Sequence, residues 1–389
     1  MTSLKKLTRP VRALYISTYI PRKCGLATFT KDLTNAINLL NPLALAEIAA
    51  MDNQISAGLR YPHEVKFRLR QEVKEDYGQV VDYVNESGQV DILVIQHEFG
   101  IFGGENGDYI LELVEKIQKP LVITLHTVLA KPTPKMKEVI RRLGKKAEYV
   151  VVMLEAAAEM LKNRYHLDKR KVIVIPHGVP DFPRLTDGKK KLGLQGKVVM
   201  TSANLVSRSK GLEYVIAAMP EILIHIPELV YFVVGETHPV VKSTEGEKYR
   251  HKLKKMAKDL NLGPHVRFVN TYLPLQKLIN YIGASDIYIT PYLDPQQAAS
   301  GSLAYAIGAG KACISTPYLY AREIFNLGCG KLVPFADSQA IARTVVETWT
   351  DKPSRLECEE KTYALGRTMT WYYVGHQYYH LLQHALNPT

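Results

Sequence analysis

Short apolar segments alternate with longer amphipathic segments along almost the whole chain. Many of the short segments are continuous apolar runs, which is the pattern of strands that helices cover on both faces. Helical periodicity separates them, for example in Gly107–Gln118, Leu154–Tyr165 and Gly211–Ile224. This alternation predicts an α/β fold with parallel, doubly wound sheets. The predicted strands are Val11–Ser17, Leu43–Met51, Asp91–Gln96, Leu121–Leu125, Tyr149–Met153, Lys171–Ile175, Lys197–Ser202, Leu229–Val234, Val266–Val269, Asp286–Thr290 and Ala312–Ser315.

The alternation is interrupted once, between residues 176 and 191. This segment holds three prolines, two glycines and a run of lysines, and we interpret it as a linker between two domains. The predicted organisation is a Rossmann-like domain at residues 1–178, a second one at residues 179–368, and an aromatic helix at residues 369–389 that crosses back toward the first domain. Ligands of such folds bind at the carboxyl ends of the strands, so we expect the two sheets to face an interdomain cleft.

Composition agrees with a globular protein of two domains. The chain has 389 residues, of which 46% are hydrophobic and 23% are charged. Its four cysteines are isolated, which favours neither a zinc site nor a disulfide framework and fits a reducing compartment. No apolar run is long enough for a membrane span, and no signal peptide is recognisable. We therefore predict a cytoplasmic protein.

The formal net charge of +12 indicates either a solvated basic surface or an anionic partner, such as nucleotide phosphates, a membrane surface or nucleic acid. The basic residues are scattered, with small clusters at Arg68–Arg70, Lys135–Lys146 and Lys189–Lys191. No nucleic-acid-binding motif lies among them. A membrane surface is compatible with this charge, but no strongly basic amphipathic helix stands out in the sequence, so we do not favour it.

Polar residues and glycines follow three strands of the N-terminal half. Gly25 opens a helix whose free amides suit a phosphate, although an ordinary turn glycine is the alternative. His97 and Glu98 end a strand and precede several glycines, and they either line a functional rim or cap a helix. Their spacing is not that of a His-Glu-x-x-His zinc site. His126 ends another strand, where it either contacts a sugar or is a satisfied structural histidine.

Strand ends of the C-terminal half carry a second set of candidates. Asn204, Arg208 and Lys210 lie between a strand and a helix, where cations and backbone amides together form a plausible diphosphate site. A solvated basic turn is the alternative. Another strand runs into His238. A further loop, which is either a ligand-binding loop or a capping loop, places polar side chains and free amides before the next helix. Its candidates are Asp294, Gln297, Ser300, Gly301 and Ser302.

The chain resembles the retaining family 4 glycosyltransferases along almost its whole length. The resemblance rests on ordered strings that mark a bacterial subgroup of that family. These strings are His97–Gly104, Thr124–Thr127, Ile175–Pro180, Thr237–Pro239 with Gly246–Arg250, and Ser300–Ala306 with Gly308–Lys311. The resemblance implies the GT-B fold, with the acceptor on the N-terminal domain and the nucleotide sugar mainly on the C-terminal domain.

Roles for individual residues follow from this resemblance. His126 matches the family histidine near the donor sugar, Gly25 lies in the loop near the phosphates, and Lys210 matches the lysine that binds the diphosphate. The segment from Gln297 to Tyr305 matches the Glu-x7-Glu element of the family. Here the sequence departs from the family pattern, because Gln297 and Tyr305 replace both glutamates. It also has Asn204 where the family usually has an arginine.

The expected reaction is transfer of a hexose, mannose or glucose, from a nucleotide diphosphate sugar to an acceptor hydroxyl by front-face displacement. Lys210 and Arg208 would stabilise the leaving diphosphate, and His97 and Glu98 would orient the acceptor. GDP-mannose and UDP-glucose are the expected donors, and we expect no metal requirement and no nucleic-acid partner. The alternatives are another GT-B enzyme, namely a nucleotide-sugar epimerase or a phosphorylase, and a non-catalytic nucleotide-sugar sensor.

Overall fold

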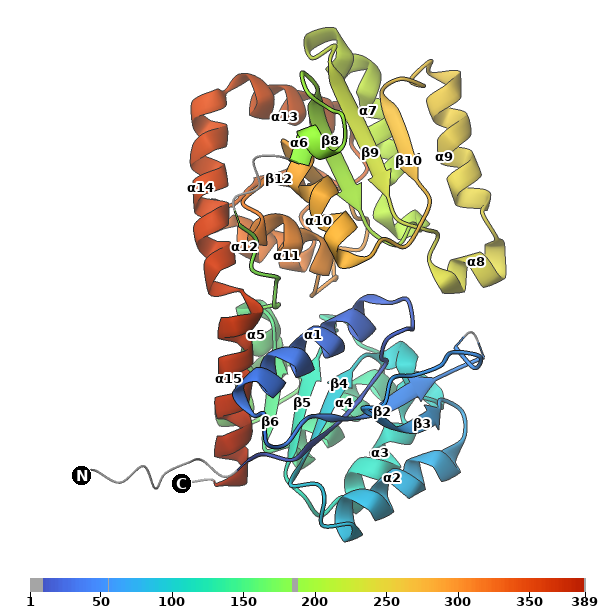
Figure 1. Ribbon diagram of the computed structural model, residues 1–389, viewed down its shortest axis with the longest axis vertical. Helices are drawn as coiled ribbons and strands as arrows, with labels where there is room; N and C mark the ends of the chain where they lie inside the picture. Colours follow the sequence, from blue (N-terminus) through green and yellow to red (C-terminus); the bar gives the residue numbers. More distant parts are fainter. Residues whose placement is uncertain (1–9, 55, 184–187, 388–389) are drawn as a thin grey trace, which may run out of the picture. The chain divides into compact units, whose positions relative to one another are not determined.

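The computed structural model describes residues 10–54, 56–183 and 188–387, and every structural statement below concerns these residues. The chain divides into two compact units. The first unit runs to Pro176 and includes the segment from Trp371 onward, and the second runs from His177 to Thr370. In each unit helices lie on both faces of a parallel sheet (Figure 1). This arrangement confirms the predicted α/β, doubly wound fold class.

The first unit is built on a seven-stranded sheet with the order β3-β2-β1-β4-β5-β6-β7. Its strands are β1 Ala13–Ser17, β2 Glu47–Asp52, β3 Val65–Arg70, β4 Ile92–His97, β5 Leu121–Leu125, β6 Tyr149–Val152 and β7 Val172–Val174. Its helices are α1 Gly25–Leu40, α2 Lys74–Glu86, α3 Tyr109–Lys116, α4 Pro134–Lys146, α5 Glu155–Asn163 and α15 Trp371–Leu386, with short 3-10 turns at Phe99–Ile101, Glu105–Gly107 and Lys169–Lys171.

The second unit is built on a six-stranded sheet with the order β10-β9-β8-β11-β12-β13. Its strands are β8 Val198–Ala203, β9 Leu229–Val234, β10 Val266–Val269, β11 Ile287–Thr290, β12 Ala312–Ser315 and β13 Lys331–Leu332. Its helices are α6 Gly188–Lys191, α7 Leu212–His225, α8 Pro239–Glu245, α9 Lys248–Asp259, α10 Leu275–Ala284, α11 Gly301–Gly308, α12 Leu319–Phe325, α13 Ser338–Thr350 and α14 Lys352–Thr368, with a 3-10 turn at Arg208–Lys210 (η4).

Both sheets reverse their winding direction at one point. In each sheet the first strand in sequence lies between the second and the fourth, so the chain moves outward first to one edge and then to the other. The reversal falls between β1 and β4 in the first unit and between β8 and β11 in the second. At such a reversal, the loops after the two neighbouring strands run in opposite directions and leave a crevice between them. Ligands of doubly wound sheets bind in this crevice.

Burial explains why most strands were predictable. All six residues of β9 are buried, as are all five of β5. Both are continuous apolar runs because helices cover both faces of the sheet. The prediction missed β3, an edge strand whose exposed positions carry Lys66, Arg68 and Arg70. The prediction also missed β13, which has only two residues. The predicted linker is wrong at its end, where residues 188–191 form the short helix α6.

The C-terminal aromatic helix α15 packs against α1 within the first unit. Gly375 allows this approach, because a Cβ atom there would lie 2.7 Å from that of Ala36. The hydroxyl groups of Tyr378 and Thr124 lie 3.1 Å apart and connect α15 to β5. In the portion of the chain covered by the structure, no helix combines the length and the hydropathy that crossing a membrane requires.

Candidate functional site

Three loops of the second unit meet at the carboxyl ends of β8, β9 and β11. The amide of His238 donates to the carbonyl of Val206 over 2.9 Å, and the amide of Leu293 donates to that of Ser209 over 2.9 Å. The close approach of these loops requires glycine at two positions. A Cβ at Gly235 would lie 1.9 Å from the carbonyl oxygen of Asn204, and one at Gly211 would lie 2.1 Å from that of Pro291. Both glycines also have positive φ, at 128° and 60°.

Lys210 ends the short turn η4 in the loop that follows β8, and its ammonium group lies over an aromatic ring. Its Nζ is 3.9 Å from the centroid of Tyr292, in the loop that follows β11. Tyr292 is buried and stacks on Tyr318 at 5.1 Å between ring centroids. Arg208, in the same turn, is more exposed and lies 3.4 Å from the carboxylate of Glu245. Arg208 also lies over a ring, 5.8 Å from the centroid of Tyr249, so the two cations differ in that only Arg208 has an acidic partner among the described residues.

Asn204, the first residue after β8, has a side-chain amide that is shielded from solvent. Neither its nitrogen nor its oxygen has a hydrogen-bond partner among the described residues. Leaving a buried amide unpaired costs roughly 1–3 kcal/mol, so such groups need an explanation. The position of this amide at the winding reversal of the sheet makes an external polar ligand the simplest explanation.

The third loop ends at the N-terminus of α11. Ser300 caps this helix, with its hydroxyl accepting from the amide of Leu303 over 3.3 Å. The hydroxyl of Ser302 donates to the carbonyl of Ala203 over 2.6 Å and lies 2.7 Å from the hydroxyl of Tyr288. These bonds fix the start of α11 against the end of β8. First-turn amides, here of Gly301 and Ser302, have no acceptor within a helix and favour an anion.

Gln297 and Tyr305 lie at either end of this element. The Gln297 side-chain amide donates to the carbonyl of Ala299 over 2.9 Å, which folds the loop onto itself. Tyr305 is buried against Phe182 and His177, with ring centroids 6.1 and 6.5 Å apart. His177 itself lies beside the start of α11, because a Cβ at Gly301 would come within 3.2 Å of its Nε2. Burial lowers the pKa of His177 to about 4, so the ring is neutral near pH 7.

Sequence reasoning missed a buried arginine that supports the second loop. Arg250 is 1% exposed and donates through Nη2 to the carbonyl of Gly235 over 2.7 Å and through Nε to Glu247 over 3.2 Å. Glu247 also accepts from the hydroxyl of Thr237 over 2.5 Å, and these contacts hold its pKa below the usual value. His238 follows and caps α8, accepting from Val240 over 3.3 Å. The sequence signal that could have revealed Arg250 is a charged residue at a position of α9 where the helical pattern places buried residues.

In the first unit, the strand-end candidates are buried to different degrees. His97 ends β4 and is fully buried between Phe102, at 5.5 Å between ring centroids, and Phe99, at 5.1 Å. Neither ring nitrogen has a partner among the described residues, and burial lowers its pKa to about 3. Glu98 is partly buried, accepts from Thr127 over 2.6 Å and from the amide of Phe99 over 3.0 Å, and has a pKa raised by burial.

His126 and Gly25 lie on either side of the reversal between β1 and β4. The Nε2 of His126 is 2.9 Å from the Gln96 side-chain oxygen, and its ring packs edge-on against Phe29 at 4.8 Å. Gly25 is the first residue of α1 after the Cys24 cap, and a Cβ there would meet nothing within 4 Å. Neither positive φ nor local packing therefore explains the glycine. Among the residues that the structure covers, no cluster of three or more His, Cys, Asp or Glu side chains is arranged to hold a metal ion.

Comparisons with known proteins agree with this architecture. The family model for glycosyl transferases group 1 matches residues 184–365, and the model for glycosyltransferase family 4 matches residues 56–181. No curated protein sequence matches the chain significantly.

Solved structures share the fold. A glycosyltransferase from Rickettsia africae aligns with a TM-score of 0.75 at 15% identity, over 98% of this chain and 100% of its own. HepE from Anabaena, in complex with UDP and glucose, aligns with a TM-score of 0.74 at 15% identity, over 96% and 99%. Sucrose-phosphate synthase from Thermosynechococcus elongatus aligns with a TM-score of 0.76 at 16% identity, over 97% and 100%. The chain therefore has the GT-B fold, and its N-terminal and C-terminal halves match the models of glycosyltransferase family 4 and of glycosyl transferases group 1, respectively.

Proposed function

We propose that the protein is a retaining hexosyltransferase that uses a nucleotide diphosphate sugar and binds the diphosphate at the reversal point of the second sheet. The observation that carries this proposal is the convergence of three kinds of anion-binding group on the ends of β8 and β11. They are the Lys210 ammonium over Tyr292, the unpaired Asn204 amide and the first-turn amides of α11. Together they would supply fixed dipoles and a cation to a leaving diphosphate.

The proposed reaction is front-face displacement. The bond between the anomeric carbon and the diphosphate oxygen breaks while the acceptor oxygen bonds to the same face of that carbon. The diphosphate leaves with the bonding electron pair, and its oxygen takes the proton from the acceptor hydroxyl. Lys210 stabilises the developing charge, with Arg208 as the second cation. Gln297, His238 and Tyr305 remain proposed members of the nucleotide-sugar site.

The first unit would hold the donor sugar and the acceptor. His126 is proposed to contact the sugar, with its ring oriented by Gln96 and Phe29. Gly25 leaves space at the start of α1 for the donor. On the acceptor side, Glu98 is proposed to contact the acceptor directly, because its side chain is partly exposed whereas His97 is fully buried. His97 would act by packing beneath the loop that carries Glu98.

The donor is proposed to be UDP-glucose or GDP-mannose. HepE, which shares the fold, was crystallised with UDP and with UDP-glucose, and this supports UDP-glucose as the first donor to try. An assay of nucleotide release, with each donor and with or without a panel of sugar acceptors, tests the proposal. Acceptor-dependent release with an α-linked product from an α-linked donor is expected. Release of free nucleotide without any acceptor would instead indicate an epimerase, and binding without release would indicate a sensor.

A further inference from the structure

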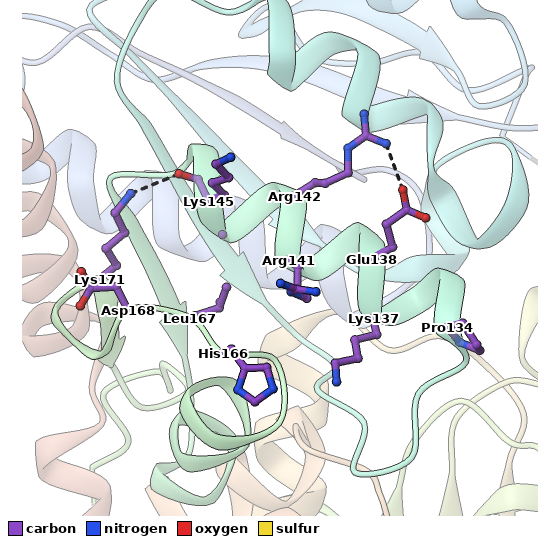
Figure 2. A pocket seen from close by; sticks show the side chains of 11 residues that line it. Pro134, Lys137, Glu138, Arg141, Arg142, Lys145, His166, Leu167, Asp168 and Lys171 are labelled. Atoms are coloured by element: carbon purple, nitrogen blue, oxygen red, sulfur yellow. Dashed lines mark hydrogen bonds and ion pairs between the residues drawn. The ribbon is translucent and has the colours of Figure 1, made fainter.

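A groove of about 630 Å³ lies in the first unit between α4 and the connection from α5 to β7 (Figure 2). We call it the α4 groove. None of the proposed donor or acceptor residues lines it. Its lining residues are Pro134, Lys137, Glu138, Arg141, Arg142, Gly144, Lys145, His166, Leu167, Asp168 and Lys171. The volume lies in the range of small-molecule sites, which is roughly 300–1,000 Å³.

One wall of the α4 groove is a row of cations on a single helix face. Lys137, Arg141 and Lys145 are spaced four residues apart, so they follow one another at about 6 Å along α4. Within the described parts of the chain, none of the three has an acidic partner. Like charges at this spacing repel one another and destabilise a helix. The row therefore costs stability that no ion pair among the described residues recovers.

The helix dipole does not account for the row either. Cations favour the last turn of a helix, which suits Lys145, but Lys137 lies close to the N-terminus, where the dipole favours anions. The first turn of α4 contains no acidic residue that would offset this. Two of the three cations are thus placed where neither partners nor the helix dipole stabilise them.

The two acids of the α4 groove are already paired with other cations. Glu138 lies 3.3 Å from Arg142 and 4.0 Å from Lys135. Asp168 bonds Arg170 at 2.8 Å, and this contact holds the pKa of Asp168 at about 2. The groove consequently keeps a net positive charge, and a concave surface of one charge concentrates ions of the opposite sign.

The concave shape is built into the local backbone. Gly144 admits the side chain of Leu167, because a Cβ at Gly144 would lie 2.6 Å from Leu167 Cδ1. In the connection from α5 to β7, the chain turns at His166, which has a φ of 58°, an uncommon conformation for a residue other than glycine. On the opposite wall, Lys171 donates to the carbonyl of Ala147 over 2.6 Å and to that of Lys145 over 3.3 Å, which fixes the turn before β7 to the end of α4.

We propose that the α4 groove binds a soluble oligoanion carrying several phosphate groups, with Lys137, Arg141 and Lys145 each contacting one of its charges. A lipid headgroup presents the same chemistry, but the exposed large hydrophobic side chains of the described chain all lie outside the groove lining. A membrane-binding surface needs such side chains to enter the lipid. A concave basic site without them fits a soluble ligand.

Inorganic tripolyphosphate is the probe, titrated calorimetrically into the full chain. The test variant carries Lys137→Gln, Arg141→Gln and Lys145→Gln. The matched control carries Lys146→Gln, Lys254→Gln and Lys258→Gln, which remove the same charge from exposed helix positions outside the groove. All three proteins are also made with Lys210→Ala, so that binding at the proposed diphosphate site is separated from binding at the α4 groove.

The expected result is binding that persists in the Lys210→Ala background and weakens at least about tenfold in the test variant, since three charge contacts are lost. The control should stay within about twofold of the parent. If tripolyphosphate binding weakens equally in the test and the control variants, net charge alone explains the effect, and the proposal is overturned. Binding lost with Lys210→Ala alone would assign the ligand to the second unit. Binding to phosphatidylglycerol vesicles that tripolyphosphate does not displace would assign the groove to a lipid surface and equally overturn it.

Discussion

The Nζ of Lys210 lies 3.9 Å from the centroid of the Tyr292 ring. Tyr292 is 1% exposed and is held by its stack on Tyr318, so the ring is a rigid support for the ammonium group. A carboxylate in the same place would neutralise the lysine, whereas a ring face orients it and leaves its charge available to an anion. The loop after β11 thus positions the cation of the loop after β8.

Replacing Lys210 with methionine tests this arrangement. The variant keeps the aliphatic packing on Tyr292 and removes the charge, so we expect the rate of acceptor-dependent nucleotide release to fall on the order of 10²–10³-fold. The midpoint of thermal unfolding should change little, because a cation–π contact of a partly exposed lysine contributes only about 1 kcal/mol. Lys254→Met, on the surface of α9, is the matched control. Turnover of Lys210→Met within about threefold of the parent would remove Lys210 from the mechanism.

Asn204 provides a test that separates binding from stability. Its buried amide has no partner among the described residues, so Asn204→Leu removes an unpaired polar group and should leave the free energy of unfolding unchanged or raise it by about 1 kcal/mol. The same change should abolish most of the thermal stabilisation that UDP or GDP gives the parent, because a ligand raises stability only through binding. A destabilised variant with an intact nucleotide shift would make Asn204 a structural residue.

The sequence predicted the fold class well because its strands are buried on both faces. β5, β9 and β12 begin and end at the predicted residues, since fully buried strands carry clear boundaries. At a sheet edge this signal is weaker: the edge strand β10 was predicted although Arg267 is exposed, whereas the edge strand β3 was missed. In β3 the exposed positions carry lysine and arginine, and Arg68 forms its ion pair with Asp52 of the neighbouring strand, a partner that only the fold reveals.

The candidate site was predictable in part for the same reason. Residues just after strands, such as Asn204 and Lys210, follow from strand positions and the rule that ligands bind at carboxyl ends. The roles of Tyr292 and Arg250 could not be found this way, because they depend on which loops meet. Arg250 acts through the carbonyl of Gly235, 15 residues earlier, and nothing in the local sequence encodes that contact.

His97 should make the first unit sensitive to acid. Its pKa is about 3 in the folded chain and about 6.5 when unfolded, so the unfolded state binds more protons between these values. Stability must therefore fall as pH drops through this window, by about 2 kcal/mol from pH 7.5 to pH 5 for this one group. His97→Leu should remove that part of the pH dependence.

Urea unfolding at both pH values, followed through the fluorescence of Trp371 in a Trp349→Phe background, measures the first unit alone, since Trp371 packs on Phe29. The control is His63→Gln, which replaces a histidine whose side chain is 94% exposed. If the parent and His97→Leu lose equal stability between pH 7.5 and pH 5, His97 is not the titrating group.

The cation row of the α4 groove should impose a measurable stability cost. Lys137→Glu converts a repulsive pair with Arg141 into an attractive one and places an acid near the N-terminus of α4, so we expect the free energy of unfolding to rise by roughly 0.5–1 kcal/mol at low salt. Lys146→Glu makes the same change of charge at the other end of the helix, where the dipole favours cations. It should lower the free energy of unfolding by a few tenths of a kcal/mol. Because both effects are electrostatic, they should shrink in 1 M salt. Thermal and urea unfolding measure both variants. If Lys137→Glu is less stable than Lys146→Glu, the cation row stabilises α4, and its presence no longer needs a ligand as explanation.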